Sequence, residues 1–330
     1  MKDFDRISEE YIERLTHYTL SRRGFLRFMG TGLAFLLSQG VRSRHALAKT
    51  GITLQPRPKR AVATDSQLGV ARGEDPAAIT RAAVEALGGM GRFVRKGDTV
   101  VVKPNIAWDR TPEQAATTNP AVVAAIVRMC LESGAKIVKV FDNTCNDARR
   151  TYLNSGIYDA VRKAGGTMYY VSDWKFYPGQ FPQGSLMNEQ VLFRDAVECD
   201  CLINVPVAKV HRLTNLSLSM KNLMGICRDR GYIHRNIDQK LTELLAFMKP
   251  DLTVIDAYRI LTANGPTGGN LKDVQKKNTV IASADPVLAD AYAATLFGRQ
   301  PGDIGALRLA AQAKLGSMDI AKARIKEVKI

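Results

Sequence analysis

The segment T-V-V-V-K-P-N, Thr99–Asn105, begins the stretch of sequence that decides the fold. Its three consecutive valines are β-branched and lie between a glycine and a proline, a pattern typical of a short buried strand. An Asn-Pro pair at Asn119 then starts a predicted helix that ends at Ser133, before a glycine. A second strand is predicted over Lys136–Phe141. A strand, a helix and a strand within about forty residues form a parallel crossover unit, so the sequence predicts a parallel sheet.

The same alternation of strands and helices continues on both sides of this unit. The stretch 172–189 is rich in glycine, proline and aromatic residues and is expected to be a long excursion. We therefore expect an α/β fold in which one or more mostly parallel sheets are flanked by helices, in a Rossmann-like layered architecture. Further strands are predicted over 168–171, 202–205, 252–255 and 279–282, and further helices over 76–87, 157–164, 236–248, 286–296 and 303–314.

Length and composition exclude several classes of protein. The chain has 330 residues, of which 45% are hydrophobic and 24% charged, so it is neither wholly disordered, nor collagen-like, nor a disulfide scaffold. It carries 47 lysines and arginines against 32 acidic residues, which gives a formal net charge of +15. A basic chain suits an anionic ligand, a nucleic acid or anionic lipid, and the charge alone does not distinguish these partners.

The N-terminal region has the pattern of an export signal. The sequence S-R-R-G-F-L-R at 21–27 resembles the twin-arginine motif, and the apolar stretch 28–37 is too short to cross about 30 Å of hydrocarbon as a permanent anchor. Ala46–Ala48 reads A-L-A, which suits signal peptidase, so cleavage is expected after Ala48. The alternative is that the two arginines merely end a charged helix. The signal predicts the twin-arginine export machinery as a partner and the periplasm as the location.

This signal sets the expected division of the chain. Residues 1–48 form the signal peptide, the polar, proline-containing stretch 49–60 forms a linker, and residues 61–330 form an α/β domain, as one body or two lobes. Cleavage removes two of the four histidines, so any histidine chemistry must use His211 and His234.

The cysteines give a weaker signal. Five remain after cleavage, an odd number for an oxidising compartment, so at least one is free or binds something. No C-x-x-C repeat is present, which argues against a self-contained zinc knuckle or ferredoxin insert. A buried, small-hydrophobe role is favoured for Cys199 and Cys201 over a metal or redox role. The five are Cys130, Cys145, Cys199, Cys201 and Cys227.

Four polar clusters follow predicted strands. Taken singly, a lysine or aspartate after a strand is more often a solvated loop residue or a helix cap than a ligand. The carboxyl ends of parallel strands meet at one edge of the sheet, however, so these distant segments are expected to form one pocket. The clusters contain Lys103 with Asn105, Asp142, Lys209 with His211, and Asp256 with the later Asn264 and Gly265.

The densest basic stretch runs from 209 to 235. Such a cluster lowers lysine and histidine pKa values by mutual repulsion and suits a phosphate, carboxylate or sulfate. The alternative, a solvated basic surface, explains its arginines but not Lys221 and Asn222 beside Leu-Met-Gly. No regular aromatic interleave or reading helix is present, so no nucleic-acid partner is expected. The stretch 265–269, G-P-T-G-G, could offer backbone N–H groups to an anion or be a plain turn.

Several ordered motifs resemble the domain-of-unknown-function 362 family. The resemblance covers about residues 61–300 and supports the pocket residues as a family signature without giving their roles. Some family members carry ferredoxin-type cysteine motifs and are described as iron–sulfur proteins, but this chain lacks those motifs. The motifs are V-V-K-P-N (101–105), T-T-N-P (117–120), N-V-P-V-A-K-V-H (204–211) and M-K-N-L-M-G (220–225).

The function expected first is that of an exported, cofactor- or metal-dependent enzyme acting on a small anionic molecule. His211, with Asp142 or Asp256, would handle a proton near neutral pH, and His211 and His234 are the candidate metal ligands. The sequence identifies neither the cofactor nor the reaction. The expected ligand-binding residues are Lys103, Asn105, Lys209, Lys221, Asn222, Asn264 and Gly265.

Two other functions stay open. One is a non-catalytic envelope protein that captures an anion or other solute, for which cationic donors suffice without a group of shifted pKa. The other is an iron–sulfur or redox role through Cys145, Cys199, Cys201 and Cys227.

Overall fold

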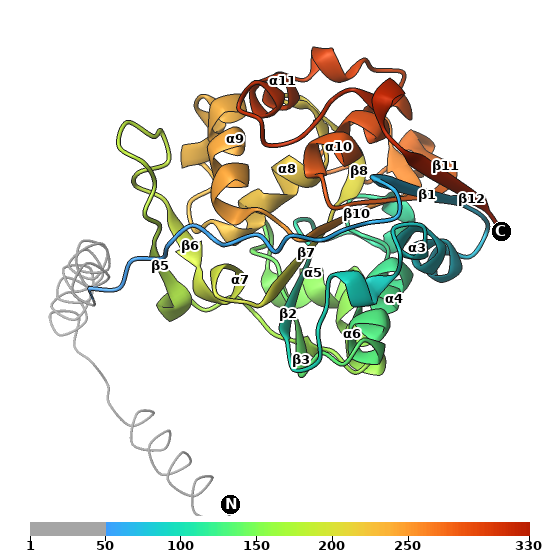
Figure 1. The fold of residues 1–330 in the computed structure, drawn as a ribbon, viewed down its shortest axis with the longest axis horizontal. Coiled ribbons are helices and arrows are strands. Elements are labelled where there is room, and N and C mark those ends of the chain that lie inside the picture. The colour runs from blue at the N-terminus through green and yellow to red at the C-terminus, as the bar shows by residue number, and fades with distance from the viewer. Residues whose placement is uncertain (1–50) are drawn as a thin grey trace, which may run out of the picture. The chain divides into compact units, whose positions relative to one another are not determined.

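The computed structural model describes residues 51–330, which fold around a ten-stranded sheet with helices on both faces (Figure 1). Its main path runs in the order β12-β1-β11-β10-β7-β2-β3-β4, and β8 and β9 extend it beside β10. The strands are β1 (Leu68–Arg72), β2 (Thr99–Pro104), β3 (Ile137–Val140), β4 (Thr167–Met168), β7 (Cys201–Val205), β8 (Val207–His211), β9 (Asn215–Ser217), β10 (Leu252–Leu261), β11 (Val274–Ser283) and β12 (Ile325–Lys329).

The direction of the strands confirms a mostly parallel α/β fold. The successive pairs β10–β7, β7–β2, β2–β3 and β3–β4 are parallel, whereas β11 runs antiparallel to both β1 and β10. From β2 the chain proceeds outward to β3 and β4, and it returns to β7 on the opposite side. The order of strands therefore reverses between β2 and β7, and a crevice beyond their carboxyl ends is the expected ligand site.

Several helices begin where the sequence supplies a side-chain cap. Asp75, Asn119 and Asp285 each accept a hydrogen bond from a first-turn N–H, and a proline follows each of them. In Figure 1, α3, α4 and α6 lie on one side of the sheet and α8 to α11 on the other. The helices are α3 (Pro76–Glu85), α4 (Pro120–Glu132), α5 (Ala148–Asn154), α6 (Ile157–Lys163), α7 (Arg194–Val197), α8 (Ser219–Asn222), α9 (Ile237–Met248), α10 (Pro286–Thr295) and α11 (Gly305–Gln312).

Strand β2 shows how the two faces of the sheet are filled. Val100 and Val102 pack in the cluster that includes α3 and α4, whereas Val101 packs in the cluster that includes α9, α10 and α11. Since successive side chains alternate between faces, a strand buried on both sides is apolar throughout. By the same alternation, Lys103 projects toward the face that carries α8.

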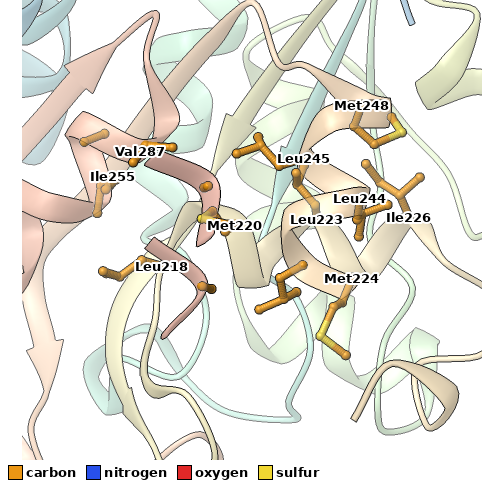
Figure 2. Packing of buried hydrophobic residues seen from close by; sticks show 14 of the residues in the cluster. Leu218, Met220, Leu223, Met224, Ile226, Leu244, Leu245, Met248, Ile255 and Val287 are labelled. Atoms are coloured by element: carbon orange, nitrogen blue, oxygen red, sulfur yellow. The ribbon is translucent and has the colours of Figure 1, made fainter. Parts of the chain in front are cut away.

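The short 3-10 helix η5 (Leu223–Ile226), which follows α8, is fixed to the domain by its apolar side chains. Figure 2 shows Leu223 and Ile226 beside Leu244, Leu245 and Met248 of α9. Burial of these side chains, at about 1.5–3 kcal/mol each, holds the intervening Met224 and Gly225 in place over the sheet.

The structure corrects the expected linker at 49–60. Leu54 forms a β-bridge with Gly179, and Arg57 is buried with a guanidinium nitrogen 2.6 Å from Asp251 Oδ2. The proline-containing composition predicted a linker. The segment instead packs on the domain, where Asp251 compensates the charge of Arg57. Thr53–Ile330 forms one compact unit rather than two lobes. The predicted signal, 1–48, lies outside the described residues.

Other elements were not predicted. The excursion at 172–189 contains β5 (Phe176–Pro178), which pairs with β6 (Val191–Phe193) in a separate two-stranded sheet. Strands β1, β12, β8 and β9 were also missed, since their short sequences have no clear period. Within residues 51–330, none of the helices has the length and apolarity needed to span a bilayer.

Candidate functional site

A cavity of about 460 Å³ opens at the carboxyl ends of β2, β3 and β8. We call it the basic pocket. It brings together residues more than 100 positions apart, as expected from the sheet, and its walls contain several cations but only one carboxylate. Its polar lining residues include Lys103, Asn105, Asp142, Lys209, His211, Lys221, Asn222, Arg228, Arg230 and His234.

A buried ion pair lies at the floor of the basic pocket. Lys103 Nζ is 2.7 Å from Asp142 Oδ1, and it also donates to the carbonyl of Pro104 at 2.8 Å. The other oxygen, Asp142 Oδ2, accepts from Ile106 N at 2.6 Å. Burial lowers the pKa of Lys103, and Asp142 opposes this shift. Asp142 is therefore the partner of Lys103 and not, as expected, of His211.

Gly225 covers this ion pair. A Cβ at this position would lie 1.9 Å from Asp142 Oδ1 and 2.7 Å from Lys103 Nζ. Only glycine allows the backbone of η5 to approach so closely. This steric restriction explains why the M-K-N-L-M-G motif ends in glycine.

Asn222 and Asn105 belong to the same buried network. Asn222 Oδ1 accepts from Lys103 Nζ at 3.1 Å and from Asn105 Nδ2 at 3.0 Å. Asn222 Nδ2 donates to Lys103 O and to Asn204 Oδ1. These four bonds use both N–H groups and both lone pairs of the Asn222 amide. Lys103, Asn105 and Asn222, predicted to bind the ligand, line the pocket and form the network at its floor.

Lys209 and Lys221 have no carboxylate within 4 Å in the described part of the chain. Lys209 Nζ donates to Ala116 O at 2.7 Å and to Asn105 Oδ1 at 3.3 Å, which leaves one of its three N–H groups. Lys221 Nζ contacts Met224 Sδ at 3.0 Å. Burial lowers the pKa of Lys209 to about 7 and that of Lys221 to about 8, and neighbouring cations add to both shifts.

His211 is a hydrogen-bond donor toward the pocket. Its Nδ1 accepts from the backbone N–H groups of Leu213 at 3.2 Å and Thr214 at 3.4 Å, so the ring proton resides on Nε2. Burial, followed by repulsion from Lys221, lowers the pKa of His211 to about 3. This lowered pKa disfavours the expected proton exchange by His211 near neutral pH. With Nε2 protonated, His211 also fits poorly as a metal ligand.

His234, unlike His211, presents a hydrogen-bond acceptor. Its Nδ1 lies 2.8 Å from Arg230 O, and because a carbonyl only accepts, Nδ1 carries the proton. Burial and Lys221 lower the pKa of His234. In its neutral form the exposed imidazole thus has a lone pair on Nε2. The pocket contains one imidazole that donates and one that can accept.

Three expected site residues lie elsewhere. Asp256 is buried, accepts from Asn119 N at 2.7 Å and Tyr258 N at 3.0 Å, and has its pKa raised to about 6 by burial. It supports the start of α4 and does not line the pocket. Asn264 and Gly265 line a neighbouring cavity, where a Cβ on Gly265 would lie 2.1 Å from Val210 O.

Sequence reasoning missed two features of the pocket wall. Trp108 lines it, although nothing in its local sequence marks it. Arg230, noted only as part of the basic stretch, donates to the carbonyls of Asn143 and Thr144 and lies 3.2 Å from Cys145 Sγ. Its guanidinium fixes the loop after β3.

The donor set does not fit a metal or an iron–sulfur cluster. In residues 51–330 no group of three or more His, Cys, Asp or Glu side chains is placed to hold a metal ion. The five cysteines, all within this range, are free thiols, and Cys145 is the exposed one. Burial raises the pKa of Cys199 to about 11, which disfavours the thiolate that binds metals.

The fold and the pocket define an α/β protein with a cationic cavity at the reversal of its strand order. A family model described as domain of unknown function (DUF362) matches residues 100–295. This is more than half of the chain, and the chain belongs to the DUF362 family.

Individual proteins show more distant similarity. The thylakoid-associated protein of Synechocystis sp. is 28% identical over 249 residues, which are 72% of this chain and 74% of that protein. The lactate racemase apoprotein from Thermoanaerobacterium thermosaccharolyticum aligns with a TM-score of 0.44 and 13% identity, over 74% of this chain and 62% of that one. A Thermotoga maritima protein aligns with a TM-score of 0.38 and 13% identity, over 73% and 60%. The chain thus spans less than two thirds of both solved structures.

Proposed function

We propose that the basic pocket binds a small anionic molecule. The observation that carries this proposal is the pair Lys209, which is buried, and Lys221, which is half-buried, two lysines with no carboxylate partner in the described residues. An anion would supply the missing charge, and charge-assisted hydrogen bonds in such a site are strong. The Nε2–H group of His211 adds a neutral donor to the same cavity.

We further propose that the protein is an enzyme in which Lys209 transfers a proton. A general acid or base works best when its pKa is near the operating pH, and Lys209, with a pKa of about 7, meets this condition where His211 does not. The donor set offers no support for a metal, so the proposal uses only side chains. The second candidate is capture of the anion without reaction. It is favoured by the floor of the pocket, where Lys103 and Asn222 already form hydrogen bonds with other protein groups.

Anion binding can be tested by calorimetry on the purified full-length chain with sulfate, phosphate and acetate at pH 6.5. We expect binding that Lys221→Met weakens about tenfold or more, since a charge-assisted bond contributes about 1.5–3 kcal/mol. Lys136→Met, at an exposed lysine outside the pocket, is the matched control and should bind as the wild type does. Absence of binding, or equal binding by both variants, contradicts the proposal.

Mass spectrometry of small molecules that copurify with the chain would then separate enzyme from capture protein. The molecule released on denaturation is returned to fresh protein and followed by NMR. A new product that Lys209→Met does not form supports the enzyme, and an unchanged molecule supports capture.

We also propose that the protein is exported and that its signal is removed after Ala48. The twin-arginine pattern at 21–27 and the A-L-A before the cut support this. Cell fractionation with N-terminal sequencing tests it. A periplasmic protein that begins at Lys49 is expected, and an uncut protein that stays in the cytoplasm, or one unaffected by Arg22→Lys/Arg23→Lys, contradicts it.

A further inference from the structure

A second cavity adjoins the basic pocket. We call it the outer cavity. It measures about 820 Å³, and three residues line both cavities: His211, His234 and Pro266. The two spaces therefore meet at the two imidazoles. Each alone lies within the 300–1,000 Å³ range, roughly, of sites that enclose organic ligands, so a bare phosphate or sulfate would fill little of the combined space.

The outer cavity is cationic in its own right. Arg212 and Arg299 line it, both are exposed, and neither has a carboxylate within 4 Å in residues 51–330. No acidic residue is among its lining residues. A guanidinium presents paired N–H groups that match the two oxygens of a carboxylate or phosphate. Each of the two joined cavities thus has cationic residues of its own.

Hydrogen bonds from neighbouring segments hold the G-P-T-G-G loop at the wall of the outer cavity. Arg110 Nε donates to Thr267 O at 3.1 Å, and Gln114 Nε2 donates to Gly269 O at 2.9 Å. Asn264 Nδ2 donates to Asp273 Oδ2 at 2.8 Å. These bonds fix the G-P-T-G-G loop and engage the carbonyl oxygens of Thr267 and Gly269, which would otherwise repel an anion.

We propose that the ligand is an elongated molecule with two acidic groups. One group lies in the basic pocket at Lys209 and Lys221, the other lies in the outer cavity at Arg212 and Arg299, and the connecting portion passes His211 and His234. This inference rests on the proposed function, because it assigns the first acidic group to the same lysines. It adds a substrate class, a dianion with separated charges, that neither cavity indicates alone.

A length series of straight-chain dicarboxylates tests the proposal. Malonate through azelate, and monocarboxylates of the same chain lengths, are titrated by calorimetry into the full-length chain at about 0.15 M salt, where long-range attraction is largely screened. We expect the longer dicarboxylates to bind at least about tenfold more tightly than their monocarboxylate counterparts, which is about one charge-assisted contact.

Variants then locate the second acidic group. Arg212→Gln/Arg299→Gln should remove most of the dicarboxylate advantage, a loss of about threefold to tenfold, and leave monocarboxylate binding unchanged. Arg128→Gln/Arg149→Gln, at exposed arginines on α4 and α5 outside both cavities, removes the same number of charges and should have no effect. Both arginines of the double variant are exposed, so the fold should tolerate their loss.

Two outcomes overturn the inference while anion binding stands. In the first, monocarboxylates bind as tightly as dicarboxylates at every length. In the second, the double variant keeps the whole dicarboxylate advantage. Failure of every dicarboxylate also overturns it, and the sulfate and phosphate titrations then show whether the proposed function fails as well.

Discussion

Lys103 Nζ lies 2.7 Å from Asp142 Oδ1 in a buried ion pair beneath the basic pocket. The pair links the end of β2 to the loop after β3, and it cancels one positive charge of the pocket. Among the lysines of the pocket, the positive charge available to a ligand therefore comes from Lys209 and Lys221. This distinction among three lysines of one cavity underlies the predictions below.

Removing one partner of this ion pair should lower the free energy of unfolding much more than removing both partners. Lys103→Met leaves Asp142 buried without its cation, and we expect a loss of about 3–5 kcal/mol in the free energy of unfolding. Adding Asp142→Leu removes the uncompensated charge and should restore part of that loss. Urea unfolding of the wild type, both single variants and the double variant measures the coupling energy. Additive losses would contradict the prediction.

Gly225→Ala should disturb the same pair. The new Cβ would overlap Asp142 Oδ1, and the backbone of η5 would have to shift, at about 1–3 kcal/mol in unfolding free energy. Gly91→Ala is the control, because a Cβ there has no atom within 4 Å. Thermal unfolding of both variants provides the comparison, and equal midpoints would show that the close approach has no energetic consequence.

Anion binding should weaken as pH rises. A lysine binds an anion best when protonated, and the pKa values of Lys209 and Lys221 are about 7 and about 8. Binding is thus strongest near pH 6, declines through pH 7–8, and above that falls by up to about tenfold per pH unit for each lysine involved. Since a bound anion favours the charged form, binding near pH 7.5 takes up protons.

Sulfate is the suitable probe, because its own charge does not change in this range. Calorimetry in two buffers of different ionisation enthalpy detects the proton uptake. An affinity that stays constant from pH 6 to pH 9 would show that neither lysine titrates on binding.

The two imidazoles should have opposite tautomers. His211 is expected as the Nε2–H form and to stay neutral at pH 5, because its pKa is about 3, whereas His234 is expected as the Nδ1–H form above its lowered pKa. Long-range proton–nitrogen NMR spectra distinguish these forms. His211→Gln and His234→Gln assign the signals. A charged His211 at pH 5 would contradict the prediction.

Much of the fold could be predicted because its signals are local. The run of valines in β2 and the Asn-Pro start of α4 act over a few residues, and a parallel crossover follows from their order. The gathering of Lys103, Asp142 and His211 at one edge also follows from strand direction. The linker prediction failed because the buried partner of Arg57, Asp251, is almost 200 residues away and leaves no trace in the local composition.

By itself, the sequence determined a mostly parallel α/β sheet and the set of polar residues at its edge, since periodicity and strand direction are properties of short segments. Only the tertiary structure decided what each of those residues does. Lys103 and Lys209 both follow apolar runs, yet one meets a carboxylate and the other does not. His211 is a donor because two backbone N–H groups face its Nδ1. Such pairings depend on distances between remote segments, and they exist only once the chain has folded.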